Sequence, residues 1–144
     1  MGVLGTALYF ALSTPVFLST ANLLNIGRQT AIVALVSIGM TFVIITGGID
    51  LSVGSVVGLS GTLAAVAIAQ AHTGPFLGAV IGLATGTSIG IINGAFIAIL
   101  RVPAIVATLA LLSIARGIAL QATNGRPISA MLPSVTSWTL ITRL

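Results

Sequence analysis

Long apolar runs follow one another along this chain, and the polar breaks between most of them are only a few residues long. A helix that crosses the roughly 30 Å of hydrocarbon in a bilayer needs about 20 mostly apolar residues. On that rule we predict five membrane spans: Gly2–Leu18 (short, and interrupted by Pro15), Thr30–Thr46, Leu51–Ala71, Phe76–Leu100 and Ala104–Leu120. The predicted breaks are Ser19–Gln29, Gly47–Asp50, Ala71–Pro75 and Arg101–Pro103. Connections this short predict an antiparallel helical bundle without linkers.

The composition supports the same class of protein. Hydrophobic residues make up 57% of the 144 residues and charged residues only 4%, which leaves too little polar surface for a soluble globule. Seventeen glycines fit helices that pack closely within lipid, where small residues let backbones approach one another. We therefore predict an all-α integral membrane protein with about five tightly packed transmembrane helices, forming one domain over residues 1–144.

The charged residues exclude several functions. The positive charges are five scattered arginines, whereas a nucleic-acid interface needs basic residues clustered on one face. The chain has one aspartate, one histidine, no glutamate and no cysteine, so we predict no catalytic residues, no cofactor and no metal site. The connections at Arg28 and Arg101 would fall on opposite faces of the membrane, so the positive-inside rule does not decide the orientation.

Glycine recurs at every fourth position in the predicted fourth span. This spacing places the glycines almost above one another and forms a groove that another helix backbone can enter. We interpret the row as a helix-packing surface, and the alternative is a groove that lets helices slide during gating. The row consists of Gly78, Gly82, Gly86, Gly90 and Gly94.

Asp50 is the only acidic residue, and it lies between two predicted spans. Gly47 and Gly48 can take the left-handed conformation that ends a helix, and Asp50, followed by Ser52, can cap the start of the next one. The turn would then act as a pivot between two helices. Alternatively, Asp50 lies on a substrate path or contacts a moving partner, because ionisable residues at membrane depth are usually functional.

Two further polar residues lie within predicted spans. Arg116 is twelve residues beyond Ala104, about 18 Å along a helix, which is past the middle of the membrane. Its side chain either extends to the interface or faces the bundle interior with a polar partner. Asn93 either makes an interhelical hydrogen bond or contacts a ligand. We treat both as candidates for a polar path through the bundle.

Three motifs resemble one known family. They are "GMTFVIITGGIDLSVGSVVGLSG" (Gly39–Gly61), "GIINGAFIAILRVPAIVATLALLSIARGIAL" (Gly90–Leu120) and "TNGRPI" (Thr123–Ile128). Their order and spacing resemble the permease subunits of bacterial ATP-binding-cassette importers of the ribose, xylose, arabinose and galactose type. The resemblance extends over nearly the whole chain up to Ile128.

The resemblance implies a permease domain in the bacterial inner membrane that pairs with a second permease subunit as a homodimer or heterodimer. A cytoplasmic ATP-binding-cassette ATPase and a periplasmic or extracellular sugar-binding protein would be its partners, together with the lipid bilayer. The Gly47–Asp50 turn would face the cytoplasm. Permeases of this family are longer, so the chain resembles an N-terminal half without the later spans and the ATPase-coupling loop.

We therefore expect a permease subunit that translocates a monosaccharide or a related small polar solute, while ATP hydrolysis takes place in a partner. Two alternatives remain open at this point. One is a small glycine-rich membrane scaffold without transport activity. The other is an ion-coupled secondary transporter, for which Asp50 is the available titrating group.

Overall fold

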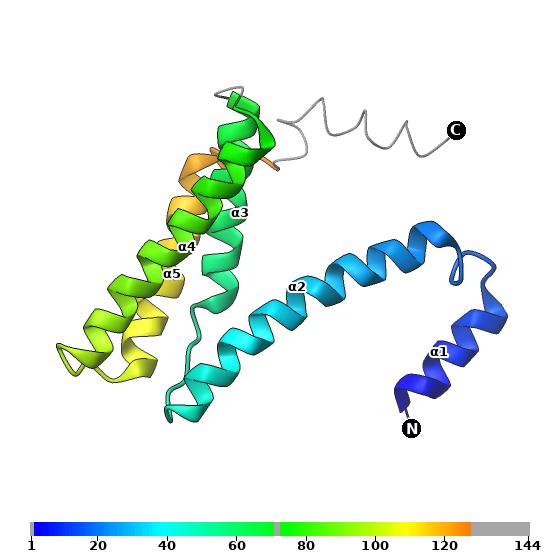
Figure 1. Ribbon diagram of the computed structural model, residues 1–144, viewed down its shortest axis with the longest axis horizontal. Helices are drawn as coiled ribbons and strands as arrows, with labels where there is room; N and C mark the ends of the chain where they lie inside the picture. The colour runs from blue at the N-terminus through cyan, green and yellow to red at the C-terminus, as the bar shows by residue number, and fades with distance from the viewer. Residues whose placement is uncertain (1, 71–72, 128–144) are drawn as a thin grey trace. The chain divides into compact units, whose positions relative to one another are not determined.

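The computed structural model describes residues 2–70 and 73–127, and helices are its only regular elements in these ranges (Figure 1). The predicted all-α fold class is therefore confirmed. The chain divides into two compact units, Met1–Thr46 and Gly47–Leu144. The helices are α1 (Gly2–Ser13), α2 (Thr20–Ile45), α3 (Val53–Gln70), α4 (Pro75–Ala98) and α5 (Ala104–Ala122).

Three helices in the described part of the chain, α2, α4 and α5, are long and apolar enough to cross a membrane. The other two, α1 and residues Val53–Ala69 of α3, are apolar but shorter. Most large apolar side chains on α2 are exposed, including Leu35 and Ile45. Such surfaces suit contact with lipid or with other membrane helices, because lipid does not penalise exposed apolar groups.

The first unit contains α1 and α2, joined by a turn. α1 ends at Ser13, two residues before Pro15, because a residue that precedes proline is disfavoured in the helical conformation. Ser19 then caps α2, and its Oγ accepts a hydrogen bond from the backbone amide of Asn22 at 3.3 Å. The side-chain amide of Asn22 donates to the carbonyl oxygen of Phe17 at 2.7 Å, which ties the turn to the new helix.

The start of α2 corrects one sequence prediction. The segment Ser19–Gln29 was predicted as a polar break, but the helix begins at Thr20, ten residues before the predicted Thr30. The reason is local, since the Ser19 cap satisfies a free amide and apolar side chains follow it. Arg28 is consequently part of α2 and not of a connection. Of the two arginines compared under the positive-inside rule, only Arg101 lies in a connection between helices.

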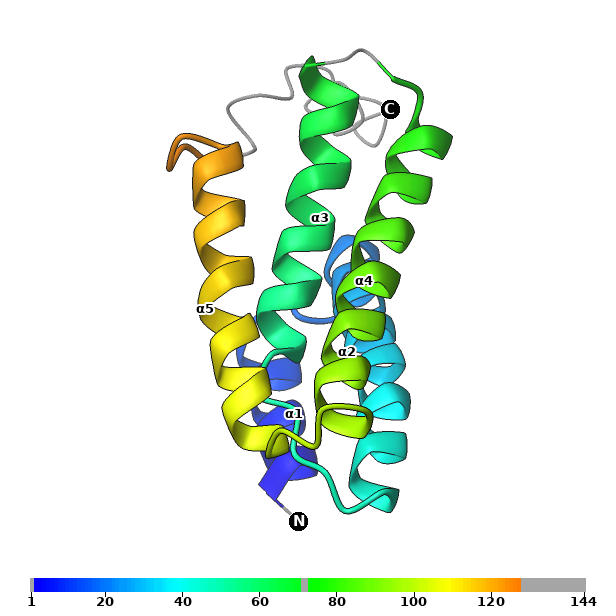
Figure 2. The ribbon, with the colours of Figure 1, turned by 90° about the vertical axis from the view of Figure 1, so that its left-hand side faces the viewer.

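The second unit is built around α3, which lies between α4 and α5 and packs against both (Figure 2). Its buried residues are mostly small, so the three helices approach closely. Among the described residues, the buried apolar side chains are Leu59 of α3 and Ala107 and Ala115 of α5, and Thr108 of α5 is also buried.

The boundaries of these three helices agree with the predicted spans to within two residues where they can be compared. Gly74 precedes α4, whose first residue is Pro75, and Pro103 precedes α5, so both prolines stand at helix starts. Proline is tolerated there because the first amides of a helix have no partner within the helix. Ala71, the predicted end of the third span, lies outside the described residues.

Candidate functional site

The glycine row of α4 meets α3 along part of its length. A Cβ atom added to Gly82 would lie 3.3 Å from the backbone oxygen of Ser60, and one added to Gly86 would lie 3.3 Å from the Ser60 hydroxyl. At Gly78 the added atom would come within 2.6 Å of the Ile68 side chain. The absence of side chains at these three positions therefore lets α4 approach the backbone of α3.

The two remaining glycines of the row have different surroundings. A Cβ atom added to Gly90 or Gly94 would meet nothing within 4 Å. The predicted groove thus divides into a section that α3 fills, up to Gly86, and an open section beyond it. The structure brings three of the five predicted packing glycines against another helix.

The turn between α2 and α3 is held by hydrogen bonds to one carboxylate oxygen. Gly47 follows α2 with a φ of +75°, a conformation that glycine adopts without steric cost. Oδ1 of Asp50 accepts bonds from the backbone amide of Ser52 at 2.7 Å and from its hydroxyl at 2.6 Å. A carboxylate that bonds two residues ahead forms a local turn of its own, which orients the chain for the following helix.

This geometry corrects the predicted cap. Asp50 was predicted as the residue that caps α3, but that position belongs to Ser52. The carbonyl oxygen of Ser52 accepts the first helical bond, from the amide of Val56 at 2.9 Å, and also a bond from the Ser55 hydroxyl at 2.7 Å. Ser52 is only 2% exposed, so Asp50 acts one step earlier by holding the buried cap residue in place.

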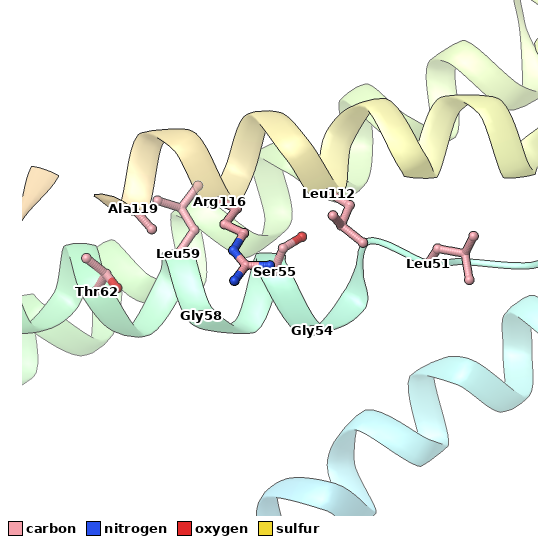
Figure 3. A pocket seen from close by; sticks show the side chains of 9 residues that line it. All are labelled: Leu51, Gly54, Ser55, Gly58, Leu59, Thr62, Leu112, Arg116 and Ala119. Atoms are coloured by element: carbon pink, nitrogen blue, oxygen red, sulfur yellow. The ribbon is translucent and has the colours of Figure 1, made fainter. Parts of the chain in front are cut away.

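A groove of about 370 Å³ lies between α3 and α5 (Figure 3). Gly54 and Gly58 of α3 line it and leave room for the Arg116 side chain, which is directed from α5 towards Ser55. Ser55 and Thr62 of α3 also line the groove. The groove therefore combines an arginine and two hydroxyl groups with otherwise apolar walls.

Sequence reasoning found Arg116 but missed the α3 side of this groove. The available signal was the spacing of four between Gly54 and Gly58 and of seven between Ser55 and Thr62, which places each pair on one face of a helix. No sequence pattern indicated that α5 would cover that face.

Asn93 of α4 lies elsewhere. It is 7% exposed and lines a smaller cavity of about 120 Å³ together with Asp50 and Ser52. Among the residues that the structure describes, its Oδ1 has no hydrogen-bond partner. The two candidates for a polar path, Asn93 and Arg116, thus line separate cavities, and the structure instead brings Asn93 to the Asp50 turn.

Comparison with known proteins assigns the chain to a family. Residues 22–140 match the family model described as "Branched-chain amino acid transport system / permease component". The chain belongs to this permease family. A permease component is not itself an enzyme. Together with the apolar helices of membrane-spanning length, family membership makes the chain a multi-pass protein of the bacterial inner membrane.

Curated relatives of this permease include proteins named for sugars. The chain is 45% identical to the ribose import permease protein RbsC of Haemophilus influenzae, in an alignment that covers 80% of the chain and 35% of the relative. It is 40% identical to RbsC of Bacillus subtilis (91% and 40%) and 38% identical to the xylose transport system permease protein XylH of Escherichia coli (88% and 33%). The resemblance to sugar-importer permeases is therefore confirmed.

The aligned part of the chain spans about a third of the length of these relatives. No solved structure matches the chain.

Proposed function

We propose that this permease is a membrane component of an ATP-driven importer that carries a monosaccharide, or a related small polar solute, across the bacterial inner membrane. The observation that carries the proposal is the match to RbsC and XylH over 80–91% of the chain. Their names specify ribose and xylose, two sugars of the same size class. The family model, named for branched-chain amino acids, supports membrane transport without selecting between these solute classes.

The groove between α3 and α5 is the part of the second unit best suited to a hydroxylated solute. Its volume of about 370 Å³ falls within the range of about 300–1,000 Å³ that is usual for small-molecule sites. The Arg116 guanidinium donates hydrogen bonds only, and the Ser55 hydroxyl, whose proton is donated to the Ser52 carbonyl, can accept one. The Thr62 hydroxyl can both donate and accept. Sugar hydroxyls both donate and accept, so these three residues could form hydrogen bonds with a sugar in the groove.

The proposed partners are a second permease subunit, a cytoplasmic ATP-binding-cassette ATPase and a soluble sugar-binding protein outside the membrane. The composition supports a division of labour, because this chain has a single carboxylate and no cysteine with which to perform chemistry. The Gly47–Ser52 turn is the proposed pivot through which movement of a partner would reach α3.

The test is uptake of labelled ribose and xylose into proteoliposomes that contain the permease with the proteins that copurify with it from native membranes. We expect an ATPase and a sugar-binding protein among the copurified proteins, and uptake that requires ATP. Arg116→Gln should reduce uptake. Arg126→Gln, which removes the same charge outside the groove, should leave uptake unchanged.

Other outcomes would contradict the proposal. A native complex with neither an ATPase nor a binding protein would favour the scaffold hypothesis. Uptake that continues without ATP but stops when the proton gradient is dissipated would favour an ion-coupled transporter. Equal losses from the two arginine substitutions would remove the assignment of the α3–α5 groove to the path.

A further inference from the structure

Arg116 is the charged residue that lines the α3–α5 groove. It lies twelve residues beyond Ala104, where α5 begins, and therefore about 18 Å along the helix. A charge at this depth in a bilayer is costly unless it meets water or an opposite charge. A long side chain can avoid the cost by extending to the interface, but Arg116 lies across the groove towards Ser55 of α3 (Figure 3). The structure therefore directs the guanidinium into the groove.

Among the described residues, no acidic side chain lines the groove with this arginine. The other lining residues are Ser55, Thr62 and residues that are either glycine or apolar. The single acidic residue of the chain, Asp50, lines a different cavity, and its Oδ1 accepts hydrogen bonds from Ser52. The groove therefore has a positive charge that no described side chain within it neutralises.

A ligand in the groove can reach this charge. Arg116 is exposed, and Ser55 and Thr62 are half-buried, so all three residues present accessible surface. Gly54 and Gly58 of α3 line the groove without side chains, and a Cβ atom added to either would meet nothing within 4 Å. The α3 wall therefore leaves open the space that a small ligand would need in front of the guanidinium.

The polar groups of the groove favour a ligand that carries an oxyanion together with hydroxyl groups. A guanidinium presents its N–H donors as a planar fork, which matches a carboxylate or a phosphate with two parallel hydrogen bonds. The Thr62 hydroxyl can donate and accept, and the Ser55 hydroxyl can accept, so both can bind hydroxyl groups of the same ligand. A volume of about 370 Å³ is sufficient for one small solute.

We propose that the α3–α5 groove is an anion-binding site, in which Arg116 binds the carboxylate or phosphate of a small hydroxylated ligand. Where it concerns transport, this inference rests on the proposed function: among sugars of one size, the groove would bind sugar acids best and amino sugars least. The anion site itself rests on the groove alone, so it is testable without transport. A phospholipid headgroup offers the same oxyanion chemistry, and the experiment below separates the two sources.

The first test measures the electrostatic potential of the groove with charged thiol reagents. The natural chain has no cysteine, so Thr62→Cys places a single thiol in the groove. Its rates of reaction with the anionic sulfonatoethyl methanethiosulfonate and the cationic trimethylammonioethyl methanethiosulfonate are compared in neutral-detergent micelles. For two unit charges about 6 Å apart in water, Coulomb's law changes each rate about threefold. Arg116→Gln should therefore lower the ratio of the anionic to the cationic rate roughly tenfold.

Two variants in the Thr62→Cys background serve as controls. Arg116→Lys keeps the charge and should keep most of the rate ratio, whereas a purely structural role of the arginine would not be rescued by lysine. Arg126→Gln removes a charge that does not line the groove and should leave the ratio unchanged. Equal effects of the two glutamine substitutions, or a thiol that reacts with neither reagent, would overturn the proposal. Gly58→Cys, at another lining position, repeats the measurement if Thr62→Cys does not fold.

The second test identifies the ligand by protection of the same thiol. Alkylation of Thr62→Cys by neutral N-ethylmaleimide is followed with added glucuronate, with glucose, or with phosphatidylglycerol in the micelles. Glucuronate should protect the thiol at a concentration roughly tenfold lower than glucose, because its carboxylate adds a charge-assisted bond, and Arg116→Gln should remove the difference. Equal protection by glucuronate and glucose would overturn the proposal.

The remaining outcomes separate the anion site from the transport function. Protection by phosphatidylglycerol without protection by glucuronate would support the anion site, assign it to a lipid headgroup and remove the groove from the solute path. A chain that shows the charge-dependent rate ratio but whose native complex takes up no sugar would contradict the proposed function and still support the anion site.

Discussion

The glycine row of α4 provides the sharpest test of how the second unit is packed. Gly82 and Gly94 lie on the same helix twelve residues apart, and each is replaced by alanine. The added methyl group at Gly82 would face α3, while at Gly94 it would enter open space. The pair therefore separates the effect of helix packing from the effect of removing a glycine.

The expected difference follows from the two distances at Gly82. Both substitutions gain about 1 kcal/mol of helix propensity. At Gly82 the new Cβ atom would lie 3.3 Å from the Ser60 carbonyl oxygen and 3.4 Å from the Cβ atom of Ala64, so α4 must retreat slightly from α3. Overpacking of this kind costs about 1–3 kcal/mol, so we expect Gly82→Ala to be neutral or destabilising by up to about 2 kcal/mol.

The assay is reversible unfolding in mixed micelles, followed by circular dichroism as a denaturing detergent is added. Gly94→Ala should shift the midpoint to a higher fraction of detergent, and Gly82→Ala should leave it unchanged or lower it. A helical spectrum for both variants before titration serves as the control for insertion.

One result would refute the reasoning. If the two substitutions stabilise the chain equally, to within about 0.5 kcal/mol, the row up to Gly86 does not lie against α3. The division of the row into a packed and an open section would then be wrong, and with it the position of the cavity that Asp50 and Asn93 line.

Three further predictions follow from the turn and from the α3–α4 register. Asp50→Ala should destabilise the chain by about 1 kcal/mol, because both hydrogen bonds that hold the cap residue Ser52 are lost. Asp50→Asn keeps an acceptor and should lose clearly less stability in the same titration. Equal losses would contradict the role of the Asp50 side chain in holding Ser52. Gly47→Ala should lower the free energy of unfolding by about 1 kcal/mol, because the φ of +75° at this position is strained for alanine. As the control, Gly39→Ala within α2 should be neutral or stabilising. A Gly47→Ala variant as stable as the wild type would contradict the conformation of the turn. Ala64→Cys combined with Gly82→Cys should form a disulfide, because the two Cβ positions are 3.4 Å apart. The natural chain has no cysteine, so the bond is seen as the loss of two hydrogens in the intact mass. Two thiols that still react with an alkylating reagent after oxidation would contradict the register of α3 and α4.

Helix positions could be predicted from the sequence wherever a strong breaker stands between two apolar runs. Proline and the Gly47–Asp50 turn mark the starts of α3, α4 and α5 to within two residues, because these residues act through local backbone geometry. The start of α2 was missed because polar residues in Ser19–Gln29 outweighed the capping signal of Ser19. Hydropathy reports how apolar a segment is, whereas a capping residue reports where a helix begins. In Ser19–Gln29 the two signals disagree, because the segment is polar but helical from Thr20.

The candidate site was only partly predictable. The glycine spacing identified a packing surface, but the point at which α3 leaves it depends on the angle between two helices, which no single helix encodes. The cavity that Asn93 and Asp50 share has the same origin, since the two residues are far apart in the sequence. Arg116 was identifiable because a charge within an apolar span is conspicuous, whereas Ser55 and Thr62 became relevant only once α5 was placed beside them.

The contact through Gly78, Gly82 and Gly86 also determines how α3 and α4 respond to force. Dispersion between two close surfaces is short-ranged, and a gap of about 0.5–1 Å already loses a quarter to a half of it. Glycine offers no long side chain that could follow a retreating neighbour and keep the contact. The helix pair should therefore be mechanically stiff under small loads and separate abruptly under larger ones.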